Sequence, residues 1–175
     1  MVEITEIEVC LDTGGFWTVG AEPSCIDPAH EHIRHQRHRH RTPVVLPDGT
    51  EVVAVSFEDA APYERDALPD FGVYLDERWN PPWPHESIEW PDFGVPAEAG
   101  PVMASLRDAL DRARAGERVE IGCLGAHGRT GTALACLAVL AGHPADDAVG
   151  WVRRTYCDQA VETDEQAAFV AGLDD

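Results

Sequence analysis

The sequence predicts an α/β domain with a mostly parallel central sheet flanked by helices. Strand patterns occupy the chain up to residue 75 and return at residues 119–123, while helical patterns prevail after residue 100. The length of 175 residues and the apolar content of 44% suit one globular domain with a buried core. The sequence shows no tandem repeat.

Two turns organise the predicted strands of the first half. Gly14 and Gly15 separate the first pair, and Pro47-Asp48-Gly49 separates the second pair, where an Asp-Gly step is a strong β-hairpin signal. In chain order, the predicted strands are residues 5–11, 16–19, 43–46, 51–57 and 71–75. The proline- and tryptophan-rich residues 79–100 predict a long functional loop.

Helices are predicted for most of the second half. In chain order, they begin at Pro101 and end at Gly116, span residues 130–141, begin again at Pro144, and span residues 163–173. The second helix is apolar nearly all round, which predicts burial in the middle of the domain.

Composition indicates which kinds of partner the protein can bind and in which cellular compartment we expect it. The net charge of −19, with 13 basic residues that are all arginine, argues against nucleic acid as a partner. No basic stretch followed by an apolar run opens the chain, and no segment approaches the ~18 apolar residues of a membrane span. We therefore expect a cytoplasmic protein with no membrane partner, whose 5 cysteines are thiols.

Residues 30–41 form a conspicuous basic stretch that holds four arginines and five histidines. The favoured interpretation is a solvated loop whose charges offset the acidic remainder. A second is a border of the active site that attracts anionic substrates. A metal site ranks last, because the intervening arginines would repel a cation.

Residues 121–131, Ile-Gly-Cys-Leu-Gly-Ala-His-Gly-Arg-Thr-Gly, predict a small-residue turn between a strand end and a helix. The backbone N–H groups of such a turn can curl around one anion. Cys123 at its entrance can supply a thiolate nucleophile, and Arg129 at its exit a permanently charged, bidentate clamp. The predicted phosphate-binding residues are Leu124, Gly125, Ala126, His127, Gly128 and Arg129.

Cys123, Arg129, Thr130 and Gly131 resemble the signature loop of the cysteine-dependent protein tyrosine and dual-specificity phosphatases, written C-x5-R-[ST]-G. We call residues 123–131 the signature loop. The resemblance implies a protein tyrosine phosphatase-like fold and hydrolysis of phosphomonoesters through a cysteinyl-phosphate. It implies no cofactor and no metal.

Residues 90–96, Trp-Pro-Asp-Phe-Gly-Val-Pro, resemble the mobile loop that carries the general acid in that family, and we call them the acid loop. Asp92 is then the acid, which protonates the leaving oxygen and later takes a proton from water. Residues 69–73 repeat Pro-Asp-Phe-Gly-Val, but Asp70 lacks the preceding tryptophan and leads directly into a strand. We therefore assign the acid to Asp92 and not to Asp70.

Two further residues gain roles from the resemblance. Thr130 matches the hydroxyl that supports the departing thiolate, although it also suits a helix start. Residues 162–166 resemble the family's segment that orients the hydrolytic water, with Gln166 at the second glutamine and Glu162 where the first is usual. Thr163 and Gln166 also fit a capping box, so Gln166 either positions water or caps a helix.

The predicted function is a protein phosphatase acting on phosphotyrosine, with phosphoserine and phosphothreonine as further candidates. A phosphoinositide, a nucleotide or an RNA 5′-phosphate is also open. One alternative is a phosphate-binding module that does not cleave, motivated by Glu162 and by Gly122 and Ala126, where the family usually has histidine and glycine. The other is a sulfur-transfer or arsenate-reducing enzyme, which the acid loop disfavours.

We expect one phosphatase-like domain over residues 1–175. Its strand-rich N-terminal part would comprise residues 1–60 and include the basic loop at residues 30–41. Its catalytic core would comprise residues 61–175.

Overall fold

The structure is a computed structural model that describes residues 7–9, 16–18, 24–25, 41–58 and 62–173. The chain forms two compact units, Met1–His38 and Arg39–Asp175. The prediction of a single domain divided near residue 60 stays a prediction. So do the interpretations of the basic stretch, because residues 30–40 lie outside the described residues.

In the first unit, the described residues form a small antiparallel sheet. Its strands are β1 (Ile7–Val9), β2 (Phe16–Thr18) and β3 (Ser24–Cys25), in the order β1-β2-β3. The first two coincide with predicted strands, and β3 was not predicted.

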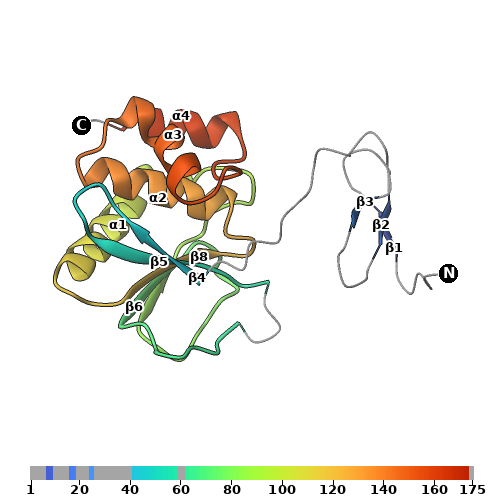
Figure 1. The fold of residues 1–175 in the computed structure, drawn as a ribbon, viewed down its shortest axis with the longest axis horizontal. Helices are drawn as coiled ribbons and strands as arrows, with labels where there is room; N and C mark the ends of the chain where they lie inside the picture. Colours follow the sequence, from blue (N-terminus) through green and yellow to red (C-terminus); the bar gives the residue numbers. More distant parts are fainter. Residues whose placement is uncertain (1–6, 10–15, 19–23, 26–40, 59–61, 174–175) are drawn as a thin grey trace. The chain divides into compact units, whose positions relative to one another are not determined.

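The described residues of the second unit form a five-stranded sheet, which Figure 1 shows beside the helices. Its strand order is β4-β5-β8-β6-β7. The strands are β4 (Arg41–Val45), β5 (Glu51–Ser56), β6 (Phe71–Tyr74), β7 (His85–Ser87) and β8 (Val119–Cys123). Among the described strands of this sheet, β4 and β5 pair antiparallel, and the β5–β8, β8–β6 and β6–β7 pairs are parallel. The predicted α/β class with a mostly parallel sheet is therefore confirmed.

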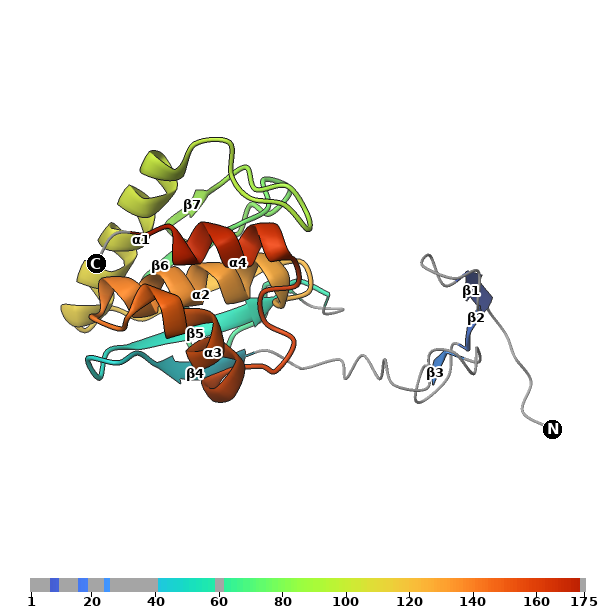
Figure 2. The same cartoon turned by 90° about the horizontal axis from the view of Figure 1, so that it is seen from above.

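Among the described residues of the second unit, four helices accompany this sheet, and Figure 2 shows α2 and α4 side by side. They are α1 (Ala99–Arg114), α2 (Gly128–Leu140), α3 (Ala145–Thr155) and α4 (Asp164–Ala171). Helix α2 is buried from its first residue to Val139, as its apolar composition predicts. It therefore gives the signature loop a rigid support.

The two faces of this sheet bury different side chains. Ala54, Val73 and Ile121 pack with the helices in the main core, whereas Val55 and Tyr74 pack with Trp83 on the other face. Period-two alternation along each strand produces this division. The strand β8 is buried along its whole length because it lies in the middle of the sheet.

Local turn signals predicted most element ends. The Asp48-Gly49 step closes the β4–β5 hairpin with Gly49 at a φ of 88°, and Gly116 follows α1 at a φ of 92°. The loop predicted at residues 79–100 instead contains β7, which pairs in parallel with β6. All three residues of β7 are polar, so the strand has no apolar alternation and its pairing depends on β6, which is distant in the sequence.

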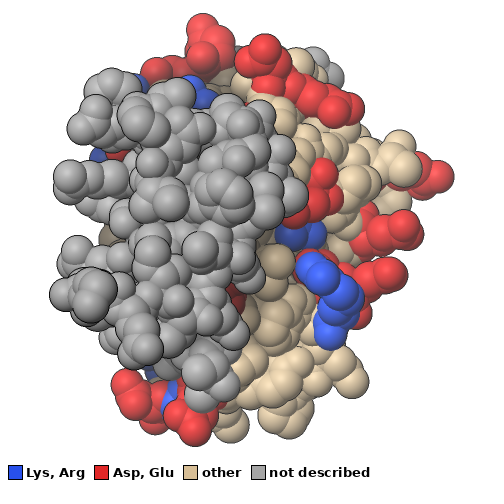
Figure 3. Space-filling model, turned by 90° about the vertical axis from the view of Figure 1, so that its right-hand side faces the viewer, with Lys and Arg blue, Asp and Glu red and all other residues tan. Residues whose placement is uncertain are grey.

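Acidic side chains are scattered over the described surface in Figure 3, and a few basic ones gather among them. In the described part of the chain, every helix is too short or too polar to cross a membrane.

Candidate active site

Cys123 ends the central strand β8 and lies at the carboxyl edge of the parallel strands, where α/β folds place their ligands. Its side chain is buried, and the Thr130 hydroxyl donates a hydrogen bond to Sγ over 3.0 Å. Thr130 lies in the first turn of α2, so the start of this helix faces the sulfur. A hydroxyl donor and a helix N-terminus both stabilise negative charge that develops on a neighbouring atom during a reaction.

Two side chains hold the carbonyls of the signature loop from outside. The Ser56 hydroxyl donates to the carbonyl of Leu124, and the Tyr156 hydroxyl donates to that of Ala126, each over 2.7 Å. Because a peptide unit is planar and trans, a carbonyl held outward turns the next N–H inward. The loop therefore presents N–H groups to its own centre.

The N–H groups of Leu124, Gly125 and Ala126 have no hydrogen-bond acceptor among the described residues. Ala126 is buried and Leu124 and Gly125 are partly buried, and buried N–H groups are almost always paired in native proteins. A run of open donors at the start of a helix is the arrangement that binds an oxyanion.

The structure accommodates both departures of the loop from the family pattern. Ala126 adopts the left-handed conformation at a φ of 57°. This conformation strains an alanine and would not strain a glycine. At Gly122 a Cβ would approach Val55 Cγ2 to 2.5 Å, so the close packing of β8 on β5 leaves no space for a side chain there.

Arg129 is buried, with 5% of its side chain exposed, and its guanidinium joins three segments. Its Nη1 donates to the carbonyls of Leu75 at 3.0 Å and Trp90 at 3.2 Å, and Nη2 lies 3.3 Å from Asp92 Oδ1. Its Nε has no hydrogen-bond partner among the described residues. An unpaired buried donor of a cation points to an anion that would complete the site.

The acid loop closes over this arginine. The Trp90 indole donates to the carbonyl of Gly94 over 2.8 Å and thereby folds the loop on itself. Phe93 adopts a left-handed φ of 58°, a strained conformation that places Asp92 next to Arg129. Asp92 remains 58% exposed, so its carboxyl can meet a substrate that enters from solvent.

Gln166 links the acid loop to α4. Its backbone N–H donates to the Thr163 hydroxyl over 3.2 Å, which confirms Thr163 as the cap of α4, whereas the reciprocal bond of the predicted capping box goes to the Glu162 N–H and not to that of Thr163. Its buried side chain does more than cap, because Nε2 donates to the Gly94 carbonyl over 3.2 Å and Oε1 accepts from the Glu162 N–H at 2.9 Å. Whether Gln166 also positions water stays a prediction.

Glu162 brings a second carboxylate to the site. Its Oε2 lies against Gly128, the first residue of α2, where even a Cβ would collide with it. Although the residue is exposed as a whole, desolvation of the carboxyl and the charge of Asp92 raise its pKa above the usual value. Hydrogen bonding to the Gly128 N–H and the charge of Arg129 oppose this shift.

Sequence reasoning missed Asp76, which anchors the arginine. This buried carboxylate follows β6 and accepts from Arg129 Nη1 at 3.3 Å and from Arg78 Nη2 at 2.6 Å. Its bonds to Arg78, together with the charge of Arg129, lower the pKa of Asp76 to about 2. The available signal was an acidic residue two places after the strand β6. Because β6 and β8 are parallel, Asp76 and Cys123 lie at the same edge of the sheet.

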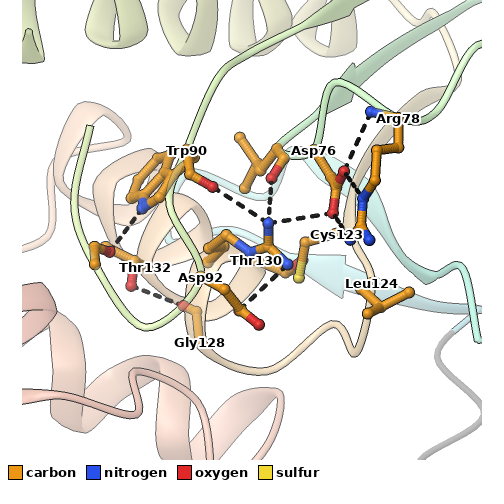
Figure 4. Close-up of polar contacts among 12 residues, drawn as sticks. Asp76, Arg78, Trp90, Asp92, Cys123, Leu124, Gly128, Thr130 and Thr132 are labelled. Atoms are coloured by element: carbon orange, nitrogen blue, oxygen red, sulfur yellow. Dashed lines mark hydrogen bonds and ion pairs between the residues drawn. The ribbon is translucent and has the colours of Figure 1, made fainter. Parts of the chain in front are cut away.

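Figure 4 shows Cys123 between Asp76 and Arg78 on one side and Asp92 on the other. The structure thus brings together Cys123, Arg129, Thr130 and Asp92. Gln166 contacts this group through its hydrogen bond to Gly94 of the acid loop. Asp70 lies elsewhere, at the start of β6, where its carboxylate accepts from the Arg118 N–H at 2.8 Å. Across the described residues, no group of three or more His, Cys, Asp or Glu side chains could hold a metal ion.

Comparisons with known proteins give both a relative and structural neighbours. No known protein-family profile matches the sequence. The uncharacterized protein MJECL20 of Methanocaldococcus jannaschii is 38% identical over 110 residues, which cover 56% of this chain and 71% of that protein. The chain belongs to the family of MJECL20. A second protein of that organism, MJ0215, is also 38% identical over 110 residues, covering 56% of this chain and 66% of its own length.

Phosphatases are among the solved structures similar to this chain. Tk-PTP in its active form has a TM-score of 0.52 and 28% identity, covering 73% of this chain and 92% of its own. A mouse dual-specificity phosphatase complexed with zinc tungstate has a TM-score of 0.57 and 16% identity, with 74% and 84% covered. A kinase-associated phosphatase with its catalytic-site cysteine replaced by serine has a TM-score of 0.54 and 13% identity, with 75% and 91% covered. The last two show the shared fold alone.

Proposed function

We propose that the protein is a cysteine-dependent phosphatase that hydrolyses phosphomonoesters, with phosphotyrosine and phosphoserine or phosphothreonine of proteins as its substrates. The observation that carries the proposal is the closure of Asp92 onto Arg129, whose buried Nε is unpaired among the described residues. The likeness to Tk-PTP, at 28% identity, supports the same activity.

In the first step, the thiolate of Cys123 attacks phosphorus. An S–P bond forms, the P–O bond to the substrate breaks, and Asp92 gives its proton to the leaving oxygen. Arg129 and the open N–H groups of the signature loop hold the three equatorial oxygens and stabilise their charge in the transition state.

In the second step, water attacks the phosphorus of the cysteinyl-phosphate. Asp92, now a carboxylate, takes a proton from the water, and the S–P bond breaks. The Thr130 hydroxyl, which donates to Sγ at 3.0 Å, stabilises the thiolate that leaves. Inorganic phosphate is released, and the net reaction consumes one water.

The geometry also weighs against the alternatives. A binding module would have no use for an acid loop that closes on the arginine, and the left-handed Ala126 retains the loop shape despite the missing glycine. A persulfide-forming cysteine needs no carboxyl aimed at a leaving alkoxide.

Hydrolysis of p-nitrophenyl phosphate by the purified protein tests the proposal. We expect turnover that Cys123→Ser abolishes, that EDTA leaves unchanged and that vanadate inhibits as an analogue of the transition state. Phosphate binding without turnover would instead favour the binding module. Turnover by the Cys123→Ser variant would show that Cys123 is not the nucleophile.

A further inference from the structure

One carboxylate joins two guanidiniums at the edge of the candidate site. Asp76 Oδ2 accepts from Arg129 Nη1, and Asp76 accepts from Arg78 through both carboxylate oxygens, at 2.8 Å from Nε and 2.6 Å from Nη2. Two positive charges thus share one negative charge. These three residues carry a net positive charge when Asp92, which lies 3.3 Å from Arg129 Nη2, is protonated.

Arg78 is held rigidly by its backbone as well as its side chain. The Trp79 N–H donates to the Asp76 carbonyl over 3.2 Å, and the Arg78 N–H donates to Asp76 Oδ1 over 3.2 Å, so residues 76–79 form a tight turn. The Trp79 ring stacks on Phe57 with ring centroids 3.9 Å apart. A cation fixed in this way loses little conformational freedom when it binds an anion.

The two arginines differ in what they can reach. The side chain of Arg129 is 5% exposed, whereas that of Arg78 is 68% exposed. The described residues give Arg78 Nη1 no hydrogen-bond acceptor. Arg129 therefore faces the reacting phosphate, while Arg78 can bind a group that remains in solvent.

Arg78 also lies within electrostatic reach of the reacting groups. The hydrogen bonds and charge of Asp76 raise the pKa of the Arg78 guanidinium, and the charge of Asp92 adds to this effect. When Asp92 carries the proton that it donates, this partner of Arg78 becomes neutral. The charge of Arg78 is then free to act on a substrate.

We propose that Arg78 forms a second anion-binding subsite beside the signature loop, which selects phosphopeptides with an acidic side chain next to the phosphorylated residue. This inference rests on the proposed phosphatase function and deepens it by naming a substrate preference. Arg78 would bind the flanking carboxylate while the phosphate occupies the signature loop (Figure 4).

Two phosphotyrosine peptides test the subsite, identical except for Glu or Gln on both sides of the phosphotyrosine. Their dissociation constants are measured by fluorescence anisotropy on the full chain carrying Cys123→Ser, with and without Arg78→Ala. We expect Arg78→Ala to weaken binding of the Glu peptide about tenfold more than binding of the Gln peptide. The parent, which is the Cys123→Ser chain with Arg78 intact, should also lose part of its preference for the Glu peptide when the NaCl concentration rises from about 0.05 to about 0.5 M.

Arg154→Ala is the matched control, because Arg154 is 61% exposed and is paired with a single carboxylate, Asp147, on α3. It should bind both peptides as the parent does. Equal losses for both peptides in Arg78→Ala would overturn the subsite, since Arg78 would then only support Asp76 and Arg129. Absence of any Glu preference in the parent would overturn it as well.

Failure of the phosphatase function would look different. The chain with Cys123 intact would then hydrolyse neither peptide, while the Cys123→Ser chain would still prefer the Glu peptide through Arg78. Binding and turnover therefore test the two proposals separately.

Discussion

At the scale of single residues, side chains from distant parts of the chain hold the signature loop in place. Cys123 and Arg129 lie close in the sequence, so a local sequence pattern is enough to predict that they share a site. Asp76 and Tyr156 contact the signature loop from distant parts of the chain, and an aspartate or a tyrosine in isolation has many structural uses. Their roles follow only from the sheet edge and the packing of α3.

The two Pro-Asp-Phe-Gly-Val repeats give a direct comparison. We predict that Asp92→Asn lowers kcat about a hundredfold on a phosphotyrosine substrate, because the leaving phenoxide loses its proton donor. Asp70→Asn should change kcat little, since Asp70 bonds only to the Arg118 backbone in the described structure. Steady-state assays of both variants measure this, and equal losses would refute the assignment.

Thr130 provides a second prediction for a single residue. Thr130→Ala removes the donor 3.0 Å from Cys123 Sγ, so the thiolate becomes a poorer leaving group in the second step. We expect slower breakdown of the cysteinyl-phosphate by about tenfold, seen in stopped flow as a burst of p-nitrophenol before a slower steady state. Thr155→Ala on α3, whose hydroxyl bonds its own helix, is the control. A first step slowed as much as the second would contradict this role.

At the scale of elements, Gln166 couples α4 to the acid loop through Gly94. Gln166→Ala leaves the Glu162 N–H and the Gly94 carbonyl without this partner, so we predict a loss of about 2 kcal/mol in the free energy of unfolding. Hydrogen exchange should accelerate in residues 90–96. Exchange that increases only within α4 would show that Gln166 is a helix cap alone, and Glu165→Ala on the same helix is the control.

Asp76 joins β6 to α2 through Arg129, and its ionisation should stabilise the fold. Its pKa is lowered from 3.8 to about 2, so this stabilisation is complete above the unfolded value and is lost as the pH falls toward 2. We predict that Asp76→Asn costs about 2 kcal/mol in urea unfolding at pH 7 and progressively less between pH ~4 and ~2. Asp108→Asn, an exposed partner of Arg112, should cost at most about 0.5 kcal/mol. A cost independent of pH would contradict the ionic role.

Turn and helix signals predicted element ends well, whereas two short strands escaped prediction. Gly49 and Gly116 adopt the left-handed conformations that their positions require, and such signals are local. The strands β3 and β7 have two and three residues and depend on partners elsewhere in the chain. The closure of the acid loop is equally non-local, because it needs Arg129 and Gln166.

At the scale of the whole molecule, the described core belongs to one unit. Every buried residue of the two hydrophobic clusters lies between Val44 and Val170, within Arg39–Asp175. We predict that removing residues 1–38 leaves a folded chain whose kcat on p-nitrophenyl phosphate is within about twofold of the full chain. Thermal unfolding and steady-state kinetics check this. A large loss of kcat with folding intact would show that residues 1–38 contribute to the site.

The central claim is that Cys123 becomes covalently attached to the phosphate during turnover. Acid quenching of the full chain within the first turnover of p-nitrophenyl phosphate, followed by peptide mass spectrometry, tests it most directly. The account predicts a phosphate on Cys123 that is absent from the same peptide of Cys123→Ser. Rapid turnover with no phosphorylated peptide, or with the phosphate on another residue, would contradict it.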